Sequence, residues 1–457
     1  MVPERMASLF GFNCFRLESF KELVSFRSLL IVSPVFVLTV KHWITLVVIV
    51  LFFGSLFFLF SKQKLRQDDT CELMFWRKLI ALILIGPVIA VSIGQLLRWE
   101  LNTANFDAPL RIALCAPIFL AVSFGWTNSN AKHPITFVWV KYSFPIGLIF
   151  TLIYKPSWTN NWGPHVITTY FVDPLSFGTL TLFFSLLAFT TLSFFWYQFG
   201  WGTRLISISA VLCGLYLSLQ SGSRTGWLNL PFYFTLWAFV FSFPTYGRLK
   251  TLFILLLMTL IIGILVSVSP HFSGKVLSSF NEVISYHWDS ENVEGSTSDR
   301  ISIYRIAIFY FLKNPIIGWG ETGWTALINS PEIIKFASFG ARTIPKYGFH
   351  NEILTSAVRS GVFGLASSLA LFFCPVFWAA KLARNSNNIA TKQISFFIII
   401  TMSHMFFSGI TTEVTNLVFL ASFWALIIAL FVGESMSLVA RSAALAVTYR
   451  ASIKRAF

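Results

Sequence analysis

Three side chains in the second half of the chain are of the types that bind phosphate and move protons. Arg224 lies in a short polar segment, SGSRTGW (221–227), whereas Arg300 and His350 lie further along, in a long polar segment. The arginine guanidinium is always charged, and its fork of donors matches phosphate oxygens. Histidine, with an ordinary pKa near 6.5, can be neutral and accept a proton. These residues predict an anionic, phosphate-bearing ligand with a proton acceptor beside it.

The elements that carry these residues belong to a membrane protein. Hydrophobic residues make up 56% of the 457 residues and charged residues only 12%, with a mean hydropathy of +0.72. Soluble domains contain about 25% charged residues. A net charge of +15 would suggest nucleic-acid binding in a soluble protein. Here much of that charge lies in loops, where it sets membrane orientation, so we expect no nucleic-acid partner.

Apolar runs of about 20 residues predict twelve membrane-spanning helices. These runs cover 24–40, 43–60, 79–97, 108–125, 134–153, 175–195, 204–220, 226–243, 249–269, 353–380, 394–411 and 415–433. We expect an all-α polytopic protein that forms a single integral membrane domain over residues 1–457.

Charge predicts the orientation of these helices. Lys and Arg gather in the segments 1–27, 61–78, 381–392 and 434–457. Because positive residues favour the cytoplasmic side, both termini are predicted to be cytoplasmic. Segment 270–352, which we call the large loop, is then predicted to face the outside and to carry the active-site residues.

Within the large loop, residues 298–313 are predicted to form a helix that begins with a cap from Ser298 or Asp299. The dipeptide Asn314-Pro315 should end this helix, because proline disfavours helix in the residue before it. A second short helix is expected over 275–288, and the glycines of IIGWGETGW (316–324) are spaced for tight turns.

The interpretation of each candidate has an alternative. Arg224 could be a topological residue, although an outward-facing arginine in so short a loop opposes the positive-inside bias. Arg300 could form a surface salt bridge with Asp299 or Glu294. His350 could be a polar residue without a catalytic role. Second-tier candidates, which could add positive field or polar contacts near the site, are Arg111, Arg98, Lys141 and Asn351.

A metal site is the competing chemistry, and we predict none. Asp68-Asp69 is a carboxylate pair, but the charge bias places it in the cytoplasm among basic residues. Asp289, Glu291 and Glu294 lie on the predicted outer side, in a segment that resembles a solvated loop. The five cysteines have no zinc spacing and imply no disulfide framework.

Several short motifs together resemble a known family. They are S-x-S-R-x-G over 221–226, N-P-x-x-G-x-G over 314–320, H-N-x-x-L over 350–354 and R-x-G-x-x-G over 359–364. In this order, and on either side of the predicted outer loop, the motifs resemble the O-antigen ligase/polymerase family of bacterial envelope glycosyltransferases. The chain length and the single large loop are similar to those of the lipopolysaccharide O-antigen ligases.

The resemblance implies an all-helical GT-C fold in the bacterial inner membrane, with the active site on the periplasmic face. It implies transfer of a glycan from undecaprenyl diphosphate to a sugar hydroxyl of lipid A–core, with inversion and without metal or cofactor. The family's arginines correspond to Arg224 and Arg300, which would bind the diphosphate, and its catalytic histidine corresponds to His350.

Two other functions stay open at this point. An O-antigen polymerase would use a second lipid-linked glycan as its acceptor. A flippase or transporter of lipid-linked sugars belongs to a different class, and it would place charges along a path through the spans rather than at one face.

Overall fold

The computed structural model describes residues 26–61, 70–126, 134–154, 166–268, 270–288, 295–321, 323–386, 388–415 and 418–456. These residues form helices and contain no β-strand, so the predicted all-α class is confirmed. The elements before the large loop are α3 (Phe26–Val32), η1 (Ser33–Phe36), α4 (Trp43–Ser61), α5 (Cys71–Arg98), η2 (Thr103–Phe106), α6 (Asp107–Ala113), α7 (Cys115–Ser123), α8 (Ile135–Val138), η4 (Trp139–Ser143), α9 (Phe144–Ile153), α10 (Pro174–Phe195), η6 (Trp196–Gln198), α11 (Trp201–Gln220), η7 (Thr225–Asn229), α12 (Leu230–Trp237), η8 (Ala238–Ser242) and α13 (Phe243–Val268). The large loop contains α14 (Pro270–Ile284), α15 (Ser296–Lys313), η9 (Gly323–Leu327), α16 (Pro331–Ile334), α17 (Phe339–Thr343) and η10 (Ile344–Tyr347), and after it come α18 (Glu352–Asn385), α19 (Ile389–Gly409) and α20 (Val418–Ala456).

In the part of the chain that the structure describes, nine helical segments are long and apolar enough to cross a membrane. They coincide with nine of the twelve predicted spans, so the polytopic class is confirmed. The other three predicted spans fall on α3 with η1, on the η7–α12–η8 series, and on α13. The total of twelve stays a prediction.

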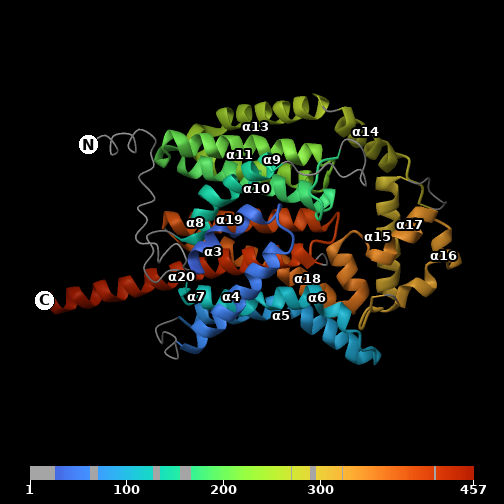
Figure 1. The fold of residues 1–457 in the computed structure, drawn as a ribbon, viewed down its shortest axis with the longest axis horizontal. Helices are drawn as coiled ribbons and strands as arrows, with labels where there is room; N and C mark the ends of the chain where they lie inside the picture. Colours follow the sequence, from blue (N-terminus) through green and yellow to red (C-terminus); the bar gives the residue numbers. More distant parts are fainter. Residues whose placement is uncertain are drawn as a thin grey trace.

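Burial separates the central helices from the peripheral ones. In α10 and α20, 89% of the apolar window is buried inside the protein, whereas in α4, α5 and α11 the share is 28–33%. Figure 1 shows α10, α19 and α20 within the bundle, with α11 and α13 toward one side and α5 toward the other. The peripheral helices therefore present their apolar side chains to the surrounding lipid.

The helices of the large loop gather at one end of the bundle, and the C-terminal end of α20 extends from the opposite end (Figure 1). The loop has a small hydrophobic core of its own, which includes Ile303, Tyr310, Trp324 and Phe349. Val358 of α18 belongs to the same cluster, so this core joins the loop to the bundle.

Helix α15 confirms the predicted helix over 298–313 and its end at Asn314, but the predicted capping residues are wrong. The helix begins at Ser296, two residues earlier than expected, and its N-cap, Gly295, has no side chain to offer. The backbone N–H groups of Thr297 and Ser298 instead donate to Glu282 Oε2 in α14, at 2.6 and 3.2 Å. A carboxylate from another helix thus takes the role that a local side chain usually has.

Helix α18 is interrupted where the R-x-G-x-x-G motif lies. Ser360 and Gly361 have non-helical backbone angles, and the φ of Gly361 is +60°. The interruption leaves backbone groups that need other partners, and residues 315–320 of the N-P-x-x-G-x-G motif supply them. The hydrogen bonds are Trp319 N to Val358 O (2.8 Å), Gly320 N to Arg359 O (3.0 Å) and Val362 N to Pro315 O (2.7 Å). The two motifs therefore form one structural unit.

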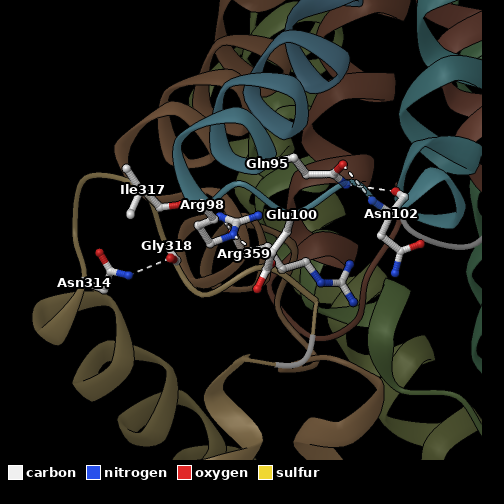
Figure 2. Close-up of polar contacts among 8 residues, drawn as sticks. All are labelled: Gln95, Arg98, Glu100, Asn102, Asn314, Ile317, Gly318 and Arg359. Carbon is white, nitrogen blue, oxygen red and sulfur yellow. Dashed lines mark hydrogen bonds and ion pairs between the residues drawn. The ribbon is translucent and has the colours of Figure 1, made fainter.

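Arg98, at the end of α5, completes this junction (Figure 2). Its Nη1 donates to the carbonyl oxygens of Ile317 at 2.6 Å and of Arg359 at 3.2 Å, and its Nε pairs with Glu100 at 3.3 Å. Figure 2 shows Asn314 beside the same turn, where its Nδ2 donates to Gly318 O at 2.7 Å. Arg98 thus connects a bundle helix, the large loop and the interrupted part of α18.

Gly361→Ala is expected to destabilise the protein by about 2 kcal/mol or more, because a side chain is strained at positive φ and collides with the backbone. A Cβ at Gly361 would lie 2.2 Å from the carbonyl oxygen of Ile316. Thermal unfolding of the purified protein in detergent measures this loss. Gly263→Ala is the control, since a Cβ there meets nothing within 4 Å. A Gly361→Ala protein as stable as the wild type would contradict the role of the junction.

Candidate functional site

The S-x-S-R-x-G segment holds Arg224 in place through the residues beside it. Ser221 Oγ accepts a hydrogen bond from Ser223 N at 3.1 Å, which closes a tight turn. Ser223 Oγ donates to the carbonyl oxygen of Leu175, in the first turn of α10, at 3.3 Å. The serines of the motif thus fix the backbone to the bundle.

A buried histidine packs against the S-x-S-R-x-G segment. His404 of α19 lies 3.0 Å from the carbonyl oxygen of Thr179 through Nε2, and 3.3 Å from Asn229 Nδ2 through Nδ1. Since a carbonyl only accepts, Nε2 carries the proton and Nδ1 accepts from Asn229. Gly226 passes close to this ring, and a Cβ there would lie 3.2 Å from His404 Cε1.

The guanidinium of Arg224 extends toward the large loop. It donates to Ser279 Oγ of α14 through Nη1, and to Ser296 Oγ at the start of α15 through Nη2, at 3.2 Å. Burial lowers the pKa of Arg224, the positive charge of Arg300 lowers it further, and the Glu282 carboxylate acts in the opposite direction. Arg224 therefore lies in a half-buried, cationic environment where α14 and α15 meet.

Arg300 lies in the second turn of α15, and its positive charge acts on both Arg224 and His350. Its charge also lowers the pKa of His350, after the larger effect of burial, from the ordinary value of 6.5. His350 Nδ1 is buried and has no hydrogen-bond partner among the described residues, so no acceptor stabilises the charged imidazolium at that atom. The charge of Arg300 thus acts on both Arg224 and His350, so the three predicted residues lie within electrostatic range in one part of the molecule.

The backbone of His350 is held in an uncommon conformation. Its φ is +47°, in the left-handed region that residues other than glycine rarely adopt. Its N–H donates to Glu413 Oε1 at 2.8 Å. The Tyr304 hydroxyl lies 2.6 Å from the carbonyl oxygen of Ile410 and 3.3 Å from that of His350. Contacts on both sides of the residue maintain the strained geometry.

Glu413 was not identified in the sequence, yet it contacts the predicted histidine directly. It is 9% exposed, and its Oε1 also accepts from Thr355 Oγ1 at 2.9 Å. Burial raises its pKa, while the positive charge of Arg359 opposes the increase. A Cβ at Gly348 would lie 2.3 Å from Glu413 Oε1, so only glycine fits beside this carboxylate. The available signal was a single charged residue in the short segment between the last two predicted spans.

Glu413 also lines a cavity of about 340 Å³ between α5, α6 and α18. Arg359 lies in its wall and pairs with Glu321 at 2.8 Å. Burial raises the pKa of Glu321, and the charges of Arg359 and Arg98 oppose this shift. The other polar residues of the wall include Asn105, Asp107, Glu352, Ser356, Ser360, Ser367, Ser368 and Thr415. The cavity therefore contains more acidic than basic side chains, unlike the surroundings of Arg224.

The second-tier candidates are engaged elsewhere. Arg98 binds carbonyl oxygens at the α18 interruption, and Arg111 contacts Asp107 Oδ1 and Thr45 Oγ1, both at 3.0 Å. Asn351 caps α18 by accepting from Leu354 N at 3.0 Å. Lys141 lies over the ring of Phe195, 3.9 Å from its centroid. The acidic residues considered as a metal site, at 68–69, 289, 291 and 294, lie outside the described residues.

Glu413→Ala should lower the stability of the protein by about 2 kcal/mol, because it leaves the N–H of His350 and the hydroxyl of Thr355 without their acceptor. Glu413→Gln keeps a carbonyl oxygen and should recover most of that loss. Thermal unfolding in detergent measures both changes. The control is Glu100→Gln, since Glu100 is 64% exposed and its ion pair contributes little. Equal stability of the alanine and glutamine variants would contradict the role of Glu413 as an acceptor.

Comparison with known proteins adds a family to this geometry. Residues 207–369 match the family model described as O-antigen ligase. A protein of Haemophilus influenzae, described as uncharacterized, is 25% identical over 209 residues, which make up 45% of this chain and 51% of the relative. The chain thus spans about half the length of that relative. Residues 207–369 thus match an O-antigen ligase domain, and Arg224, Arg300 and His350 all lie within the matched region.

Proposed function

We propose that the protein is a polyprenyl-diphosphate-dependent glycosyltransferase, an O-antigen ligase of GT-C type in the bacterial inner membrane. It moves O-antigen glycan from undecaprenyl diphosphate to a sugar hydroxyl of lipid A–core at the periplasmic face, where the large loop lies. The observation that carries this proposal is that Arg300 acts electrostatically on both Arg224 and His350, and that all three lie inside the matched region 207–369.

The arginines suit a diphosphate leaving group. As the bond between the anomeric carbon and the phosphate oxygen breaks, negative charge develops on the diphosphate. Arg224 and Arg300 remain charged at any working pH and neutralise that charge. Removing one such contact in a catalytic site typically costs about 3–4 kcal/mol of barrier.

His350 is the base in this scheme. The acceptor hydroxyl oxygen attacks the anomeric carbon, and His350 takes the hydroxyl proton while polyprenyl diphosphate departs. The nucleophile enters opposite to the leaving group, so the configuration at the anomeric carbon inverts. Burial and the charge of Arg300 lower the pKa of His350, which favours the neutral imidazole that can accept this proton. We propose that the reaction needs no metal and no cofactor.

The deciding experiment is glycan ligation by the purified protein, with lipid-linked O-antigen as donor and rough lipopolysaccharide as acceptor, in EDTA. High-molecular-weight lipopolysaccharide is the expected product, and His350→Ala should reduce its rate by roughly 10²–10⁴-fold. His287→Ala, an exposed histidine of the same loop, is the matched control. Chain extension with lipid-linked glycan alone would indicate a polymerase, and a fully active His350→Ala protein would exclude His350 as the base.

The pH dependence of kcat/KM gives an independent prediction. Burial and the charge of Arg300 lower the pKa of His350 below 6.5. The neutral imidazole therefore predominates above pH 6.5, and it is lost as the pH falls through the pKa of the folded protein. The acid limb should therefore lie below pH 6.5 in the wild type. Arg300→Gln removes the neighbouring charge and should move this limb upward, whereas Arg300→Lys should not. A wild-type limb above 6.5 would contradict the assignment.

A further inference from the structure

Helix α14 has two chemically different faces. Val276, Leu277, Phe280, Val283 and Ile284 follow one another along one side of the helix, at a spacing of three to four residues. We call this set the α14 stripe. Its members are 43–69% exposed, which is unusual for a contiguous row of large apolar side chains outside the bundle.

The opposite face of α14 meets the candidate diphosphate site. Ser279 accepts a hydrogen bond from Arg224, and Glu282 accepts the first N–H groups of α15. One helix therefore separates a cationic phosphate-binding position from an apolar surface. A ligand with an anionic head and a hydrocarbon chain fits both sides of such an element.

A second row of exposed apolar side chains lies on the helix before α14. Helix α13 directly precedes α14, and its residues Leu256, Leu260 and Ile264 are 53–61% exposed along one line. In Figure 1, α13 runs along the edge of the bundle, and α14 continues from it toward α15. Exposed apolar side chains therefore occur on both helices, including α14, the helix that contacts Arg224.

We propose that the α14 stripe binds the isoprenoid chain of the lipid diphosphate, in the units next to the diphosphate, while Arg224 holds the diphosphate itself. This inference rests on the proposed function for the nature of the donor. The site then selects lipid-linked glycan donors by their lipid chain as well as by their charge. Branched, unsaturated isoprene units offer apolar contact without any polar group to satisfy.

The test is equilibrium binding to the purified full-length protein in detergent micelles, measured by calorimetry. The probes are undecaprenyl diphosphate, dimethylallyl diphosphate with a single isoprene unit, and undecaprenol without phosphate. The variant is Val276→Ser/Phe280→Ser/Val283→Ser. Its control is Ile308→Ser/Leu312→Ser on α15, where the two side chains are 48% and 69% exposed. Because Phe280 is 63% exposed, Phe280→Ser alone serves if the triple variant does not fold.

The triple variant should weaken the binding of undecaprenyl diphosphate by about tenfold or more, because several apolar contacts are lost. It should weaken dimethylallyl diphosphate much less, because that probe offers the stripe a single isoprene unit, and the control variant should change neither. Arg224→Ala should weaken both diphosphates. An equal loss for both diphosphates in the triple variant would overturn the proposal, because it would indicate a disturbed Arg224.

Two further outcomes separate the stripe from the proposed function. If the triple variant binds all probes normally in micelles but loses activity in vesicles, the stripe contacts bulk lipid and the proposal is wrong. If the wild type binds neither diphosphate, the proposed function fails. In that case a weaker affinity of the triple variant for undecaprenol would still support the stripe, and an unchanged affinity would overturn it.

Discussion

The position of the large loop depends on the interruption of α18. Where a helix breaks near a membrane, its freed carbonyl and N–H groups need partners, because unpaired ones are costly away from water. Segment 315–320 pairs them through the main chain, and Arg98 adds a charged donor to the same carbonyls. The loop is thus joined to the bundle by backbone hydrogen bonds that few substitutions can remove, and α18 leads directly from this junction back to His350.

Carboxylates complete the arrangement on the loop side. Glu282 accepts the first N–H groups of α15 and lies near Arg224, so it orients the helix that carries Arg300. Glu413 holds the backbone of His350 from the segment before α20. Each carboxylate comes from a different element than the group that it holds. The site therefore exists only when α14, α15, α18 and the segment before α20 have all packed together.

The sequence was sufficient for features that depend on local pattern. Apolar run length predicted nine of the helices that are long enough to cross a membrane, and Asn314-Pro315 predicted the end of α15. The roles of Arg224, Arg300 and His350, which were chosen by residue type, stay predictions. Features that depend on tertiary contact were missed. Nothing near Ser298 shows that the cap of α15 comes from α14. Arg98 was interpreted as a source of positive field because the carbonyls that it binds are free only after α18 is interrupted.

The contacts of Arg224 also affect how an anion would bind to it. Its guanidinium bridges α14 and α15 through two neutral serine hydroxyls. Oxygens of a diphosphate form charge-assisted hydrogen bonds that are roughly twice as strong as neutral ones, so they would displace the serine hydroxyls. The net gain in binding free energy is smaller than the strength of the new bonds, because the serine hydrogen bonds are lost. The exchange also removes a link between the two helices. Occupancy of the arginine is therefore coupled to how tightly the first helix of the loop is held against the second.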